Sequence, residues 1–256
     1  MKTTYISFLI LANIAFQACT CEEIPSDLMD GEGTFSLSVQ TGEIQTEVIT
    51  RTETQNLVNV NDFKVSLKDQ AGISLIQGKP YAELSDADRT LPAGEGYRIA
   101  LESCTAEEAV KANNGWGTYR FIGASTFNII TDQSTDVTIN CTMQNAGLQL
   151  IFDNTFITKF PTHAATTQDA RALVFKSTNS SAIAYYDVTS STTVPISISG
   201  SAGSWADQVN ITKDITLTQG KITRLTVKYD ENSGNLDIDF ETDTDVDEES
   251  TDVTIK

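Results

Sequence analysis

The sequence is poor in the residues that most catalytic sites use. It has one histidine, His163, and four cysteines in 256 residues. A single imidazole gives little basis for a histidine-based triad, a histidine-rich zinc site or a Cys-His pair. We find no phosphate-cradling loop, GxSxG elbow or dinucleotide fingerprint either. We therefore expect no enzyme, no cofactor and no metal, and His163, in a loop-like segment, is expected to be an inert surface residue.

Basic residues are also scarce. Seventeen Lys and Arg stand against 35 Asp and Glu, which gives a formal net charge of −18. A chain so acidic repels phosphate backbones, so nucleic acid is not an expected partner. With only 5 prolines and 39% hydrophobic residues, the chain is neither collagen-like nor disordered as a whole. Its length suffices for one large or two modest domains.

The first 18 residues differ from everything that follows. Lys2 gives a short positive start, and residues 6–18 form an apolar run. This run is too short for a membrane span, which needs about 20 apolar residues, but it is typical of a signal peptide. We expect residues 1–18 to be removed on export.

Cys19 follows the apolar run directly after Ala18, which resembles a bacterial lipobox, although Phe16 and Gln17 stand where Leu and a small residue are usual. We expect Cys19 to be acylated, with residues 19–30 as a lipidated linker and the outer membrane as the anchor. The acidic pair after Cys21 resembles a surface-export signal, so the protein should face outward from the cell. The alternative is an ordinary signal peptide cleaved near Ala18.

The remaining cysteines, Cys104 and Cys141, would lie in a compartment where disulfides survive. Cys141 shares the inward parity of Val137 and Ile139, whereas Cys104 lies just past a predicted strand at 97–101. A disulfide and a pair of free thiols, with Cys141 buried, both remain open.

Alternation of apolar and polar residues with period two dominates beyond residue 30. Phe35, Leu37 and Val39 show it first. The pattern recurs at 63–67, 97–101, 137–141, 148–152, 194–198, 215–217, 225–227 and 236–240. Turn signals such as Asn113-Asn114-Gly115 separate these segments. Many short strands with frequent turns predict β-sandwiches.

One short helix is expected from Thr105 to Ala112, because Thr105 suits an N-cap with Glu108 three places on. The number of strands exceeds what one sandwich uses. We therefore predict an all-β fold of two Greek-key β-sandwich domains with one short helix, at residues 31–146 and 147–256.

Several segments together resemble a known family. They are NDFKVSL at 61–67, Gly72, PYAEL at 80–84, LPAG at 91–94 before Tyr97, Trp116 with Tyr119 and Gly123, and the stretch 137–150. This set is similar to a family of Bacteroides-type surface lipoproteins catalogued as a domain of unknown function, which resembles the fimbrillin-like pilus proteins. The resemblance implies transthyretin-like sandwiches and a role in surface structures or adhesion. The implied partners are pilin-like subunits or host and glycan ligands.

Arg51 lies in the polar stretch between the first predicted strand and Phe63. Fimbrillin-like subunits resemble this arrangement when they are cut after such an arginine, lose the first strand and accept a strand of another subunit. Main-chain hydrogen bonds would then supply affinity and alternate side-chain pockets would supply register. The alternative is an uncut loop arginine.

Trp116 stands between Gly115 and Gly117, where its indole could stack on a sugar. The alternative, usual for large aromatic residues, is that it folds back as a core or lid residue with Tyr119 and Phe121. Trp205 carries the same ambiguity. We expect a fimbrillin-like structural or adhesion protein, with a surface glycan-binding lipoprotein that uses loop aromatics as the alternative.

The acidic tail has Asp243, Asp245 and Asp247 at alternate positions, like the opening of a calcium loop. Glu248 stands where the turn glycine is needed and Thr254 where the bidentate acid belongs, which excludes an EF-hand. A nonspecific calcium site and a solvated acidic loop remain the alternatives, and the loop is favoured.

Overall fold

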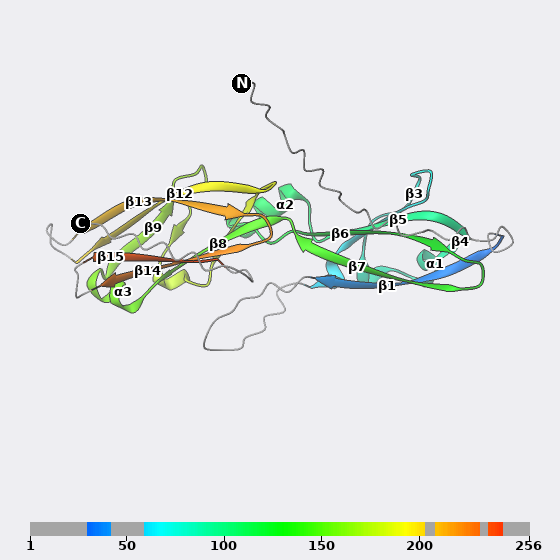
Figure 1. The fold of residues 1–256 in the computed structure, drawn as a ribbon, viewed down its shortest axis with the longest axis horizontal. Coiled ribbons are helices and arrows are strands. Elements are labelled where there is room, and N and C mark those ends of the chain that lie inside the picture. Colours follow the sequence, from blue (N-terminus) through cyan, green and yellow to red (C-terminus); the bar gives the residue numbers. More distant parts are fainter. Residues whose placement is uncertain (1–29, 42–58, 203–207, 231–234, 243–256) are drawn as a thin grey trace, which may run out of the picture.

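The computed structural model describes residues 30–41, 59–202, 208–230 and 235–242. These residues form β-strands with a few short helices, arranged as two β-sandwiches placed end to end in an elongated molecule (Figure 1). The predicted all-β sandwich fold is confirmed. No helix of the described part is both long enough and apolar enough to cross a membrane.

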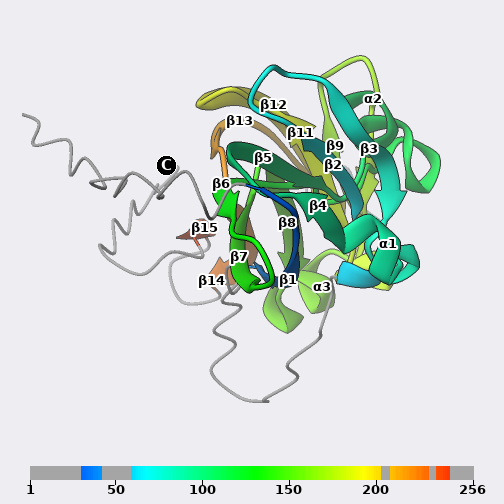
Figure 2. The ribbon, with the colours of Figure 1, turned by 90° about the vertical axis from the view of Figure 1, so that its right-hand side faces the viewer.

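The first sandwich contains seven strands, in the sheet order β3-β2-β5-β6-β7-β1-β4. Their bounds are β1 Glu32–Thr41, β2 Lys64–Lys68, β3 Ser74–Pro80, β4 Thr90–Pro92, β5 Gly94–Glu102, β6 Phe121–Ile129 and β7 Ser134–Met143. Strands β6 and β7 share only the pairs Phe121↔Met143 and Ile122↔Thr142. The sheet therefore folds over at this point, with β1 and β7 on one side and β2 and β3 on the other (Figure 2).

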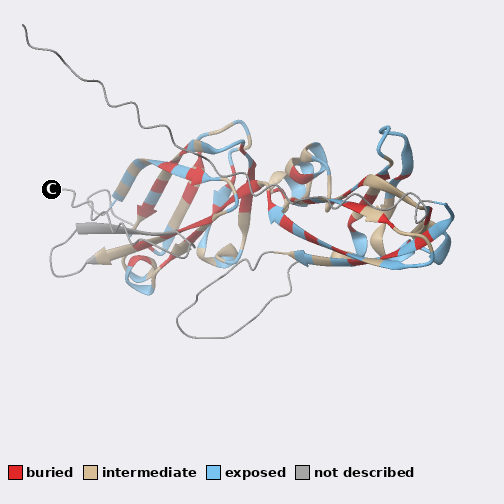
Figure 3. Cartoon of the chain, turned by 45° about the vertical axis from the view of Figure 1, so that its right-hand side comes forward, coloured by how far each residue is buried: buried red, intermediate tan, exposed pale blue. Residues whose placement is uncertain are grey.

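Strand alternation builds the core of the first sandwich. Buried and exposed residues alternate along its strands (Figure 3), as period two requires. The rings of Phe35 on β1 and Phe127 on β6 lie 5.2 Å apart across the layers. Val65, Leu67, Leu101 and Ile139 are wholly buried in the same cluster.

The second sandwich contains two four-stranded sheets, ordered β10-β9-β12-β13 and β11-β8-β14-β15. Their bounds are β8 Asn145–Phe152, β9 Thr162–Thr167, β10 Val174–Phe175, β11 Ile183–Asp187, β12 Ser191–Ser201, β13 Gln208–Thr218, β14 Ile222–Asp230 and β15 Asn235–Thr242. Leu148, Leu150, Phe175, Ile196 and Leu217 are wholly buried between the sheets. The chain passes from the first sandwich to the second at Gln144, so the predicted boundary at 146/147 lies within the first residues of β8.

Three short α-helices interrupt the strands: α1 Asp86–Arg89, α2 Ala106–Lys111 and α3 Asn154–Lys159. The predicted helix is α2, with the predicted capping box. The Glu108 N–H donates to the Thr105 hydroxyl over 3.2 Å, and the Thr105 N–H donates to the Glu108 carboxylate over 2.8 Å. The expectation of a single helix is wrong, because α1 and α3 also form, with N-caps at Ser85 and Asp153. Unlike α2, α3 has the sequence NTFITK, which lacks the Ala and Glu that favour a helix.

Candidate functional site

Strand β1 lies between β7 and β4, but only β7 accompanies it along its length. It runs parallel to β7 from Thr34↔Ser134 to Thr41↔Cys141. The antiparallel pairing with β4 ends at Thr34↔Thr90. Beyond that point, within the described residues, the side of β1 away from β7 is held by a side chain: the Tyr81 hydroxyl donates to the Leu37 carbonyl over 2.8 Å. The first strand is therefore attached chiefly through one ladder.

The side chains of β1 fill one face of the core. Phe35 is 2% exposed and Leu37 is 7% exposed, while Val39 packs partly buried against the same cluster. Between them Ser36 points outward and donates to Asp136. Burying such a side chain stabilises the fold by roughly 1.5–3 kcal/mol, so β1 is integral to the first core.

A junction between the sandwiches is built from the excursion between β5 and β6, which includes α2. The Tyr185 N–H on β11 donates to the Trp116 carbonyl over 2.7 Å. The Trp116 ring meets Phe175 edge-on, with centroids 4.9 Å apart. Tyr119 contacts Phe121 on one side and Tyr185 on the other. The structure therefore packs the partly buried Trp116 against the second core, with Phe175 as its ring partner in place of the expected Tyr119 and Phe121.

Arg171 joins the two sandwiches from the other side of this junction. Its guanidinium pairs with Asp169 over 3.1 Å and donates to the carbonyls of Gly115, over 3.2 Å, and Tyr185, over 2.8 Å. It also stacks 3.8 Å from the ring centroid of Tyr186. Burial raises the pKa of Asp169, but hydrogen bonds from Thr167 and Arg171 outweigh it and hold the pKa below its usual value.

Asn145 is the buried polar side chain at the centre of the junction, with an exposed fraction of 3%. Its amide donates to the Thr118 carbonyl over 2.7 Å and accepts from the Arg120 N–H over 3.1 Å. The backbone carbonyl of Asn145 accepts a hydrogen bond from the Gly220 N–H over 2.9 Å. Neither Asn145 nor Arg171 was predicted from the sequence, because the backbone groups they bind across the junction lie at least 25 positions away in the chain.

The two central cysteines are free thiols in the structure, which is the second of the two alternatives. Cys141 points into the core of the first sandwich, and burial raises its pKa to about 11, so its thiolate is scarce. The Cys104 thiol is partly buried and donates to the Tyr119 carbonyl over 3.6 Å. Burial raises the pKa of Cys104 as well.

His163 does not lie in a surface loop, so that expectation is wrong. It belongs to β9, with Nδ1 2.8 Å from the Phe160 carbonyl oxygen and its ring 4.6 Å from Phe152. The Phe156 ring also meets the imidazole edge-on, with centroids 6.0 Å apart.

Cys19, Arg51, Trp205 and the acidic tail lie outside the described residues. Within the described residues, no group of three or more His, Cys, Asp or Glu side chains is placed to hold a metal ion. The structure there defines an all-β molecule whose first strand has one full-length neighbour and whose two sandwiches meet at a hydrogen-bonded junction.

Residues 31–256 match the model of a family described as a domain of unknown function (DUF4493), and the chain belongs to this family. The resemblance found in the sequence to a family of unknown function is thereby confirmed. A comparison with curated proteins finds no match.

Several solved structures are similar to the chain at low identity. A fimbrial assembly protein from Parabacteroides distasonis is 11% identical, with a TM-score of 0.47, over 88% of this chain and 99% of that one. A candidate cell adhesion protein from Bacteroides ovatus is 10% identical, with a TM-score of 0.44, over 86% of this chain and 100% of that one.

Proposed function

We propose that this chain is a non-enzymatic structural or adhesion component of the bacterial surface: a fimbrillin-like pilus subunit, anchor or adhesin. The observation that carries the proposal is the position of β1. It is the first described strand, it has one full-length partner, and it fills the core with alternate apolar side chains. A strand of that kind is the part of a sandwich that a strand of another subunit can replace.

The geometry gives a physical basis for such a replacement. If β1 left, the groove beside β7 would lose the side chains of Phe35 and Leu37 and would expose the backbone groups of residues 134–141. A donated strand with apolar residues at alternate positions would refill the core and would pair with the exposed backbone groups of β7. Cleavage after Arg51 would separate β1 from the rest of the chain.

The proposal includes two processing steps and a mechanical role for the junction. Acylation of Cys19 would hold the chain on the outer membrane, and cleavage after Arg51 would release it. The uncut chain would therefore serve as an anchor or adhesin, and the cut chain as a polymerising subunit. The junction of Arg171, Asn145 and Trp116 would transmit force between the sandwiches, because its contacts couple both cores.

The test is a gel of unboiled protein, extracted with detergent from its own cells, beside a boiled sample. A ladder that collapses on boiling supports strand-linked polymers. A Cys19→Ala variant should leave the membrane fraction without detergent if the lipid anchor is present. An unmodified Cys19 in the mature chain, seen by mass spectrometry, would contradict the anchor.

A disulfide across β1 and β7 makes the test specific. Ser38 and Thr138 are exposed register partners in the parallel ladder, within the reach of a disulfide. We expect the Ser38→Cys/Thr138→Cys variant to form no ladder when oxidised and to recover it when reduced. The Ser38→Cys single variant is the control. A ladder that persists in the oxidised double variant would show that β1 does not leave.

A further inference from the structure

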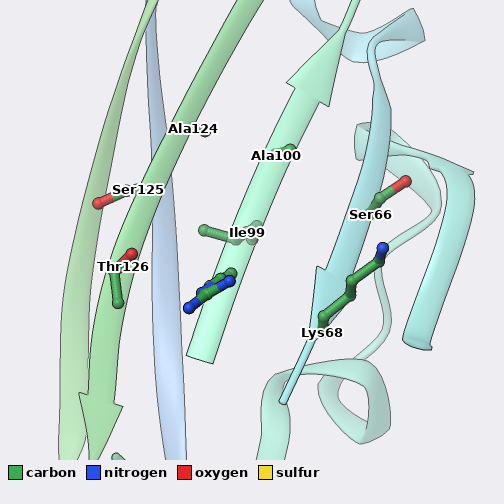
Figure 4. Close-up of a pocket in the computed structure, with 8 residues that line it drawn as sticks. Ser66, Lys68, Ile99, Ala100, Ala124, Ser125 and Thr126 are labelled. Carbon is green, nitrogen blue, oxygen red and sulfur yellow. The ribbon is translucent and has the colours of Figure 1, made fainter. Parts of the chain in front are cut away.

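A hollow of about 460 Å³ lies on the outer face of the first sandwich, over β2, β5 and β6 (Figure 4). Its floor is made of short side chains, because Ala100 and Ala124 are direct register partners and Ser66 pairs with Ala100. The longer side chains of Lys68 and Arg98 lie at one end of the hollow. No residue of β1 lines the hollow, so its lining stays the same when β1 is replaced.

Two cations stand side by side at that end. Lys68 on β2 and Arg98 on β5 are register partners, and Thr126 on β6 continues the row. Like charges directly opposite one another destabilise a sheet. Neither cation has an acidic partner among the described residues, although acidic residues outnumber basic ones two to one in the chain.

Two neighbouring cations, by contrast, are each paired with an acid. Lys64, on the same strand as Lys68, pairs with Glu108 over 3.2 Å. Arg120 pairs with Glu102 over 2.7 Å. The acid nearest in sequence, Asp69, accepts a hydrogen bond from the Ile73 N–H within its own turn. Lys68 and Arg98, which have no ion-pair partner among the described residues, therefore form a positive patch at the end of the hollow.

The geometry points to a binding site for a polysaccharide chain that carries carboxylate groups. A uronic acid ring has an apolar C–H face for the Ala100 and Ala124 floor, and a carboxylate for the cation pair. The Ser66 hydroxyl already accepts from the Gly78 N–H over 3.2 Å, and its hydrogen can be donated to the ligand. A peptide strand is a poorer occupant, since β2 and β5 are paired on both sides and leave no backbone edge.

The experiment uses the full mature chain with Cys19→Ala, and calorimetric titration at low salt with polygalacturonate. Fully methyl-esterified polygalacturonate is the matched probe, because it keeps the chain and loses the charge. We expect binding to the acid and none to the ester. Arg98→Gln and Lys68→Gln should each weaken binding about tenfold, as the loss of a charge-assisted hydrogen bond does.

Two variants locate the site. Ala100→Trp should fill the hollow and abolish binding, while Lys64→Gln removes the same charge from a paired lysine and should leave the affinity unchanged. Circular dichroism checks that each variant is folded. No binding to polygalacturonate, equal binding to the ester, or an equal effect of Lys64→Gln would overturn the proposal. Displacement of polygalacturonate by a synthetic peptide of residues 241–252 would assign the hollow to an acidic protein segment instead.

Discussion

Asn145 shows how much a single residue can hold together in this molecule. It is almost fully buried, and its amide satisfies one acceptor and one donor of the backbone, at Thr118 and Arg120. Both backbone groups belong to the excursion between β5 and β6, whereas Asn145 begins the first strand of the second sandwich. Removing the amide therefore weakens the junction rather than either core.

We expect Asn145→Ala to lower the free energy of unfolding by roughly 1–3 kcal/mol, because two buried backbone groups lose their partners. Urea denaturation of the mature chain measures it. Asn154→Ala is the control, since Asn154 is exposed on α3 and should change stability by less than about 0.5 kcal/mol. Equal effects of the two variants would mean that the hydrogen bonds of Asn145 contribute nothing.

The junction residues also mark the limit of sequence analysis at this scale. The position of Trp116 between two glycines allowed both an open and a packed ring, and only Phe175, from another part of the chain, decides between them. Arg171 and His163 have local partners in Asp169 and Phe160, but their contacts with Gly115 and Phe152 cannot be read from neighbouring residues. Local patterns specify which side chains are apolar, but not which distant residues meet them.

At the scale of elements, the sequence predicts a feature correctly when all the residues that cause it are close together in the chain. The capping box of α2 lies within four residues, so the sequence predicts it. Alternation predicts the faces of β1 and β7, because period two is a property of the strand itself. The parallel pairing of these two strands needs coordinates, since nothing in residues 34–41 specifies a partner a hundred residues away.

Strand β1 provides a prediction that separates folding from assembly. Leu37→Ala should lower the free energy of unfolding of the monomer by about 2–5 kcal/mol, because it creates a cavity in the first core. If β1 is lost on assembly, the boiling-sensitive ladder should be unchanged, since Leu37 is then absent from the polymer.

Gln40→Ala, on the exposed face of the same strand, is the control for stability. Unfolding followed by tryptophan fluorescence gives the monomer value, and the unboiled gel gives the ladder. A ladder weakened by Leu37→Ala in proportion to monomer stability would indicate that β1 remains in place.

For the whole molecule, the alternation of the sequence predicted the all-β sandwich fold but not the contacts between the two sandwiches. The sequence also sets the net charge, whose effect on stability depends on the structure. Self-repulsion at −18 destabilises the compact state at neutral pH, and protonation of exposed carboxylates relieves it as the pH falls towards the sequence pI of about 4.3.

A second set of carboxylates acts in the opposite direction, because their pKa values lie below the usual range in the folded protein. Hydrogen bonds from the side chain of Lys79 lower the pKa of Asp88, and backbone hydrogen bonds lower the pKa of Asp153, at Thr155, and of Glu108, at Thr105. Such groups stabilise the folded state above their unfolded pKa, and the contribution is lost as the pH falls through the folded pKa.

The two effects predict a melting temperature that is highest at mildly acidic pH. It should rise as the pH is lowered from 8 to about 5, where repulsion weakens. It should fall below about 4, where these carboxylates begin to protonate in the unfolded chain while the folded protein still holds them ionised. Differential scanning calorimetry measures both limbs. In 1 M NaCl the rise should disappear, because salt screens repulsion between exposed charges, while the fall should persist for the hydrogen-bonded groups. A melting temperature that declines steadily from pH 8 would mean that hydrogen-bonded carboxylates, rather than net charge, dominate the pH dependence of stability.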